Sequence, residues 1–329
     1  MPHSKAIDIH AHYFGEGYLQ LFNEQSARYA TEYRSTKDGW YFKSSIASVG
    51  PLPSKFIDTK QRIVEMDQQG VAVQALSLTA PMVYWAEPEF SRRLAQAWND
   101  DAVAAHTAFP DRLVVLATLP MLDPDRAIDE INRVSKLRGV RGIYMGTNIN
   151  NRDLDDPLFE PIFARIEALG LPIFLHPLQT IGGPRLSVFY LNNFLGNPFD
   201  TAIAACHLIF GGVLDRYPNL QVNLPHAGGA LLGLIGRIDH GWKVRPETKH
   251  LAQAPSTYLR RFTYDTISHS APVLNFMISQ VGADRVMLGS DYCFDMGCER
   301  PLALLDELKI SDADRKLIVG ETAAKLLKI

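Results

Sequence analysis

The chain has 329 residues, of which 47% are hydrophobic and 21% are charged, and its formal net charge is -3, which is typical of a globular protein. A near-neutral charge without a block of Lys or Arg argues against a nucleic acid as the main partner and favours a small molecule. Three scattered cysteines, no signal peptide and no run of roughly 20 apolar residues indicate a cytoplasmic protein without a membrane span.

Short apolar runs rich in β-forming residues recur along the chain and predict strands. The first is 6–12, and seven others follow at 71–76, 113–117, 140–145, 171–175, 220–224, 262–266 and 285–289. Helical patterns separate them, for example at 59–69, 89–108, 125–137, 157–169 and 272–281. Alternating strands and helices imply parallel strands, and eight such units close into a (β/α)8 TIM-type barrel.

One long segment, 13–57, interrupts this alternation after the first strand. It contains Trp40, Tyr41 and Phe42. A connection of this length is usually functional or carries its own small structure, so we interpret it as a lid over the barrel mouth, with a surface decoration as the alternative. Helices at 304–308 and 312–327 close the chain, and no linker marks a second domain. We therefore expect a single domain over 1–329.

Metal-binding and acidic residues gather where the predicted strands end. His10 and His12 end the first strand, His176 ends the fifth, His226 follows the sixth and Asp291 follows the eighth. Residues i and i+2 of a strand point the same way, and catalytic groups of such barrels lie at the carboxyl ends of the strands. A histidine pair alone more often forms hydrogen bonds, but the combined set predicts a site for a divalent metal ion.

His226 is the candidate for proton transfer. A histidine that is not a metal ligand titrates near neutral pH, and His226 precedes Gly228 and Gly229, which allow close approach of a substrate. The ligand types suit zinc, with manganese or iron as alternatives. Cys293 lies two residues after Asp291, but no cysteine motif surrounds it, so we interpret it as a residue of the pocket wall.

At these positions the sequence resembles the amidohydrolase-like metal-dependent decarboxylases, and most closely their 2-amino-3-carboxymuconate-6-semialdehyde decarboxylase branch. The resemblance extends over nearly the whole chain. The motifs that carry it are 8–12, 65–71, 84–89, 118–121, 176–177, 226–229, 236–241 and 289–292.

The resemblance implies one divalent metal ion, usually zinc and in some members manganese, bound at His10, His12, His176 and Asp291. It implies acid/base chemistry at His226, which Asp291 could share. It also implies a homodimer in which an arginine that matches Arg245 reaches the neighbouring subunit's site and holds a substrate carboxylate. A planar guanidinium is suited to that contact because it can donate two parallel hydrogen bonds.

Two positions depart from the family pattern, and both are expected to line the substrate pocket. Lys43 stands where the family has a second carboxylate-binding arginine, and a lysine cannot form the same two-pronged contact. Asn193 stands where the aminocarboxymuconate enzymes have a tryptophan. We expect Trp85, His269 and the aromatic residues of the insertion to shape the rest of the pocket.

These observations predict a metal-dependent, non-oxidative decarboxylase of an unsaturated or aromatic carboxylic acid. The first alternative is a hydrolase or hydratase on the same scaffold, acting on a lactone, an amide or a carbon–carbon bond, because the fold does not decide the chemistry. The second is a metal-binding protein without catalytic activity. A complete ligand set with a further histidine argues against this second alternative.

Overall fold

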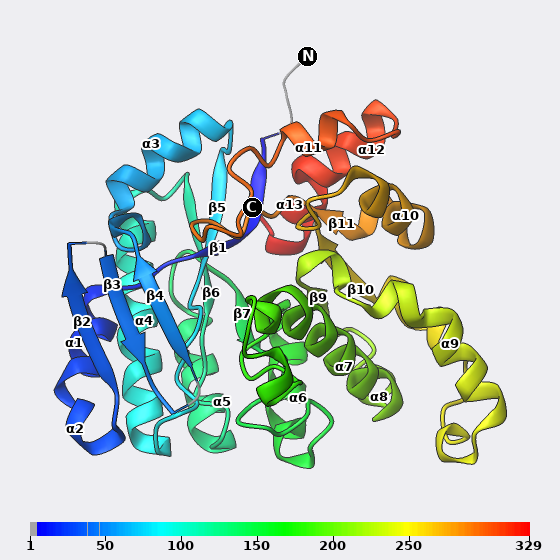
Figure 1. Cartoon of the computed structure of the whole chain (residues 1–329), viewed down its shortest axis with the longest axis horizontal. Helices are drawn as coiled ribbons and strands as arrows, with labels where there is room; N and C mark the ends of the chain where they lie inside the picture. Colours follow the sequence, from blue (N-terminus) through cyan, green and yellow to red (C-terminus); the bar gives the residue numbers. More distant parts are fainter. Residues whose placement is uncertain (1–4, 38, 46) are drawn as a thin grey trace.

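The computed structural model describes residues 5–37, 39–45 and 47–329. Eight parallel strands in this part of the chain form one sheet (Figure 1), and their order in the sheet follows their order in the sequence. The strands are β1 (Ile7–His12), β5 (Val73–Ser77), β6 (Leu113–Ala117), β7 (Val140–Gly146), β8 (Ile173–His176), β9 (Val222–Leu224), β10 (Phe262–Asp265) and β11 (Val286–Met287).

Backbone hydrogen bonds close this sheet into a barrel. Ile9 N donates to Leu288 O at 2.9 Å, and His12 N donates to Tyr292 O at 2.6 Å, so β1 meets the segment that follows β11. The predicted (β/α)8 fold is therefore confirmed. The strands are buried on both faces, which is why the sequence shows them as continuous apolar runs and not as alternating ones.

Helices follow the strands and surround the barrel (Figure 1). They are α3 (Thr59–Gln69), α4 (Pro88–Ala108), α5 (Pro124–Val134), α6 (Glu160–Leu169), α7 (Asn197–Phe210), α8 (Val213–Arg216), α9 (Leu231–Val244) and α10 (Ala271–Val281). Helix α3 has the predicted bounds because both ends carry strong signals. The Asp58 side chain accepts hydrogen bonds from Lys60 N and Gln61 N, and Gly70 ends the helix in a left-handed conformation.

The insertion after β1 contains two helices and a small antiparallel sheet. Its elements are α1 (Glu16–Glu24), α2 (Ser26–Tyr29), β2 (Glu32–Thr36), β3 (Gly39–Lys43) and β4 (Ser48–Leu52). Aromatic side chains join the sheet to the barrel: the Phe42 ring lies 5.0 Å from Phe14, and Phe14 lies 5.8 Å from Phe56. A lid function of this segment stays a prediction.

Three short helices close the chain after β11. They are α11 (Ala303–Asp306), α12 (Asp312–Lys316) and α13 (Thr322–Leu327), and a π-helical segment, Leu317–Glu321, joins the last two. The predicted continuous helix over 312–327 therefore contains a wider turn, whose Ile318 and Val319 are buried against the barrel. Within the described residues, no helix combines the length and apolar character needed to cross a bilayer.

Candidate metal centre and active site

Histidine and carboxylate side chains from four separate segments meet at one end of the barrel. Ligand-type atoms of His10, His176, His226 and Asp291 all lie within 4.8 Å of one another. His12 joins this cluster through its Nε2, which lies 2.9 Å from Asp291 Oδ1. The rings of His10, His12 and His176 have centroids 5.0 to 5.3 Å apart. The residues predicted from the strand ends are thus brought together.

Hydrogen bonds behind the cluster fix the orientation of two of these imidazoles. His10 Nδ1 lies 2.8 Å from Asp265 Oδ2, and its Nε2 is buried without a hydrogen-bond partner among the described residues. His176 Nδ1 donates to Pro177 O at 2.8 Å. Because Nδ1 carries the hydrogen in both rings, the Nε2 lone pairs face the centre, as in metal-binding histidines.

The contact between His12 and Asp291 shows that this donor set suits a cation. Ser77 Oγ donates to Ala11 O, so it accepts from His12 Nδ1 at 3.1 Å and leaves His12 Nε2 with a lone pair. Burial lowers the pKa of His12 to about 4. Burial alone would raise the pKa of Asp291, but hydrogen bonds and charges of the histidines lower it well below its usual value. His12 Nε2 and Asp291 Oδ1 lie 2.9 Å apart, and both are atoms of the kind that binds a divalent cation.

The other histidine pKa values differ according to their neighbours. Burial lowers the pKa of His176 well below its usual value, and the neighbouring imidazolium charges act in the same direction. Burial also opposes protonation of His10, but its hydrogen bond to Asp265 and the charge of Asp291 raise its pKa overall. His176 is thus kept neutral, which is the protonation state that a metal requires.

Asp265, at the end of β10, is a site residue that the sequence reasoning missed. Its fully buried carboxylate accepts four hydrogen bonds, from His10 Nδ1 and from the backbone N–H groups of His226, Ala227 and Ile267. It therefore orients one candidate ligand and holds the turn that presents His226. Its position at the end of a predicted strand was the available signal, because the same rule identified His176.

His226 occupies the turn after β9 and is less constrained than the other imidazoles. Its Nε2 lies 3.9 Å from Asp291 Oδ2, and its Nδ1 has no hydrogen-bond partner among the described residues. The left-handed conformation of this residue, with φ of 53°, turns its ring toward the cluster. The geometry fits both proton transfer and metal binding, so the division of roles between His226 and the predicted ligands stays a prediction.

A buried cation supports the same cluster from behind. The Arg62 guanidinium on α3 donates to His12 O and to Gln74 Oε1, and Gln74 in turn donates to Asp8 Oδ2 at 2.9 Å. Asp8 also accepts from Ser290 N, which precedes Asp291. This chain of contacts ties β1, β5 and the segment after β11 together, so it positions His12 and Asp291 relative to each other.

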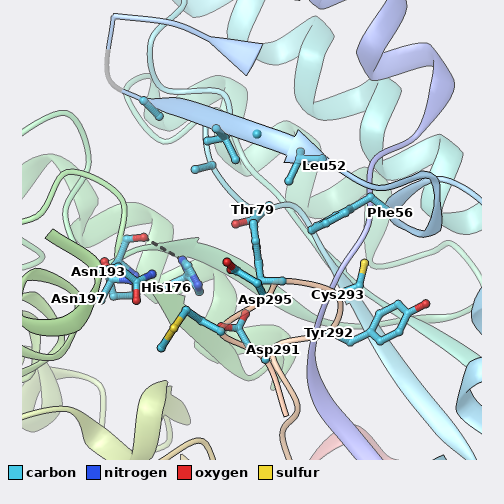
Figure 2. Close-up of a pocket in the computed structure, with 18 of the residues that line it drawn as sticks. Leu52, Phe56, Thr79, His176, Asn193, Asn197, Asp291, Tyr292, Cys293 and Asp295 are labelled. Carbon is cyan, nitrogen blue, oxygen red and sulfur yellow. Dashed lines mark hydrogen bonds between the residues drawn. The ribbon is translucent and has the colours of Figure 1, made fainter. Parts of the chain in front are cut away.

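A cavity of about 1110 Å³ opens beside the cluster (Figure 2). His176 and Asp291 form part of its wall, and Leu52 and Phe56 show that the insertion contributes to it. Asn193 lines the cavity, as predicted from its place in the sequence. Cys293 also lines it, and burial raises the pKa of its thiol to about 12, which makes a thiolate nucleophile unfavourable.

The remaining predicted substrate-binding residues lie elsewhere, and none is among the described residues that line this cavity. Trp85 packs into an aromatic group, 5.1 Å from Phe22, and its indole N–H donates to Met82 O. Lys43, at the end of β3, is exposed, and so is His269 in the loop after β10. Arg245 is exposed at the end of α9 and pairs with Glu247. The predicted substrate contacts of these four residues stay predictions.

A sequence model described as amidohydrolase matches residues 7–329. The chain belongs to the amidohydrolase family. The 2-amino-3-carboxymuconate-6-semialdehyde decarboxylase of Dictyostelium discoideum is 35% identical over 295 residues, which cover 88% of this chain and 80% of that protein. The gamma-resorcylate decarboxylase of Rhodococcus jostii is 28% identical over 84% of this chain and 90% of its own length. These matches confirm the family predicted from the motifs.

Solved structures agree with the sequence matches. The crystal structure of 5-carboxyvanillate decarboxylase from Sphingomonas paucimobilis superimposes with a TM-score of 0.84 at 26% identity, and the match covers 99% of each chain. All three of these relatives are named decarboxylases. The comparisons therefore support the predicted decarboxylase and do not favour the alternative hydrolase or hydratase.

Proposed function

We propose that this amidohydrolase-family protein removes CO2 non-oxidatively from an unsaturated or aromatic carboxylic acid, with a divalent metal ion bound at its barrel mouth. The observation that carries this proposal is the cluster of histidines and Asp291 at the edge of the cavity, in a chain whose relatives are decarboxylases. His10, His12, His176 and Asp291 would hold the ion. Zinc fits these ligands, with manganese or iron as alternatives.

The reaction requires an electron sink and a proton. When the carbon–carboxylate bond breaks, its electron pair stays on the substrate carbon, and that carbon takes up one proton as CO2 leaves. A divalent ion supplies Lewis-acid polarisation of a substrate oxygen. His226 would deliver the proton, because its ring has few hydrogen bonds to restrain it and lies at the cluster. Asp291 Oδ2, 3.9 Å from His226 Nε2, would stabilise the protonated imidazole.

We also propose that two copies of the chain associate through the face around α7 and α9. An apolar groove between these helices is lined by Phe199, Phe210, Trp242 and Arg245, and Phe199 is 43% exposed. Contiguous exposed apolar surface of this kind is typical of interfaces. The exposed Arg245 at its edge would then be available to reach a substrate carboxylate in the partner's cavity.

The activity is tested by loading the protein with zinc or manganese and measuring the release of labelled CO2 from hydroxybenzoates carrying a 13C-labelled carboxyl group. We expect CO2 release by the wild type and a loss of about 100-fold or more in the variant His226→Asn, as for removal of a general acid. Turnover of a lactone without CO2 release from any acid would contradict the decarboxylase and favour the hydrolase.

A further inference from the structure

The cavity beside the cluster of histidines and Asp291 is lined by more acidic than cationic side chains. Among the described residues that line it, three are acids, namely Asp291, Asp295 and Glu299. One lining side chain, Lys55, is cationic at neutral pH, and burial lowers the pKa of the other basic one, His176. With a divalent ion bound at the cluster, the charges of the ion and of Lys55 together equal those of Asp291, Asp295 and Glu299. The positive charge of the ion lies at Asp291 and the histidines, however, so a substrate carboxylate placed next to Asp295 would still meet a like charge, and like charges repel more strongly in a cavity than in bulk water.

Asp295 is the acid whose position matters most. It follows Asp291 by four residues, is exposed to the cavity and accepts no hydrogen bond and forms no ion pair within the described part of the chain. Figure 2 shows it pointing into the cavity, between Thr79 and Asp291 and beside His176 in this view. Tyr190 lines the same cavity, and burial together with the charges of Asp295 and Asp291 raises the pKa of its hydroxyl.

The lysine in the wall is engaged elsewhere. Lys55 Nζ lies 3.5 Å from Glu65 Oε2 and 5.4 Å from the centroid of the Tyr292 ring, which Figure 2 shows directed away from the cavity. Gln179 also lines the cavity, but its Oε1 is buried and has no hydrogen-bond partner among the described residues. Asp295 is therefore the accessible acceptor in a wall that also contains the apolar side chains of Leu52 and Phe56.

We propose that Asp295 determines specificity by accepting a hydrogen bond from a hydroxyl or amino group of the substrate and by repelling a second carboxylate. The substrate is then a monocarboxylic acid with a donor substituent on a flat apolar body. This inference rests on the proposed decarboxylase function. It agrees with the proposed dimer, in which the partner's Arg245 would bind one substrate carboxylate. Lys43, the other predicted carboxylate-binding residue, lies outside the described lining of the cavity, so a second carboxylate would lack a basic partner.

The test compares substituted 2-hydroxybenzoates on the metal-loaded protein. The parent acid is compared with acids that carry an additional hydroxyl or an additional carboxylate at ring position 4, 5 or 6. For the wild type we expect one position at which the hydroxyl raises kcat/KM about 10-fold to 100-fold, the range of a hydrogen bond to a charged group. A carboxylate at that position should lower kcat/KM by a similar factor.

Three variants separate the specific role of Asp295 from the effect of the overall negative charge of the cavity. Asp295→Ala should abolish both preferences, and Asp295→Asn should remove the penalty against the second carboxylate. Glu299→Gln, a matched loss of one negative charge in the same cavity wall, should leave both preferences within about threefold. Equal preference of the wild type for di-acids and hydroxy acids, or unchanged preferences in Asp295→Ala, would overturn the proposal.

Equilibrium binding of the same acids, measured by calorimetry, distinguishes this proposal from the proposed function. If the acids bind with the expected preferences but none releases CO2, the decarboxylase assignment fails and the role of Asp295 stands. If CO2 is released without these preferences in binding or turnover, the role of Asp295 is refuted and the decarboxylase stands.

Discussion

Replacement of Asp265 by asparagine should reverse the tautomer of His10. The asparagine side chain has one oxygen for the four donors that the carboxylate serves. If that oxygen serves Ala227 N and Ile267 N, the amide NH2 faces His10 Nδ1 and His226 N. His10 can then accept at Nδ1 only by carrying its hydrogen on Nε2, the atom that faces the cluster.

The substitution should weaken metal binding and should also destabilise the fold. Loss of the orienting partner should weaken metal binding about 10-fold to 100-fold, the range observed when groups behind metal-binding histidines are removed. The backbone N–H of His226 would lose its partner inside the protein, and such a buried donor costs about 1–3 kcal/mol of unfolding free energy. Stability should therefore fall even without metal, and metal affinity should fall in addition.

The dissociation constant of zinc, measured by competition with a chromophoric chelator, and the urea unfolding of the metal-free protein report these effects separately. Glu130→Gln is the matched control, because Glu130 on α5 is a buried carboxylate that accepts from Asn99 and pairs with Arg133, with no contact to the histidines. It should lose stability but keep its zinc affinity. Wild-type zinc affinity in Asp265→Asn would refute the orienting role.

Three further perturbations test the site and the packing. Chelation of the metal should abolish CO2 release, and adding zinc or manganese should restore it; full activity of metal-free protein would contradict the proposed function. Gly139→Ala should lower the free energy of unfolding by about 1–3 kcal/mol, because its φ is 88° and a Cβ would lie 2.3 Å from the His106 ring. Gly183→Ala is the control in thermal unfolding, because Gly183 also has a positive φ, of 46°, but its Cβ would meet open space, so the difference between the two variants reports the clash. Asp58→Ala should lower the free energy of unfolding by about 1 kcal/mol, because the Asp58 side chain caps α3. Asp58→Asn should lower it much less, because an asparagine oxygen can accept the same hydrogen bonds.

Local patterns made most of the fold predictable. The bounds of β6 and α3 match the prediction because an apolar run and a capped helix each carry their signals within a few adjacent residues. The strand ends also identified His10, His176 and Asp291, since one rule about parallel barrels converts positions in the sequence into positions in space. Predicted boundaries were less accurate elsewhere: α5 ends at Val134 and not at residue 137, and the regular pairing of β11 is only two residues long although the sequence pattern extends over five.

The pocket was less predictable, because its wall is assembled from segments far apart in the sequence. Lys43 was assigned to it from the family resemblance, and Trp85 and His269 were expected to shape it, but the structure places all three outside its described lining. Asp265 was overlooked although it lies at the end of a predicted strand, and Asp295 was overlooked because a single carboxylate in a loop carries no spacing signal. Only the fold shows that Asp265 accepts four hydrogen bonds, whereas Asp295 accepts none from the residues that the structure describes.

The sequence by itself determined the barrel, the family and the set of residues able to bind a metal, because hydrophobic periodicity and strand ends are local properties. The tertiary structure decided which donors face which acceptors: the Nε2 atoms turned toward Asp291, the Asp265 carboxylate behind His10 and the acidic wall around Asp295. The physical reason is that hydrogen bonds and charges act over a few ångströms, and these short distances are created only when β1, β8, β10 and the segment after β11 are closed into one barrel.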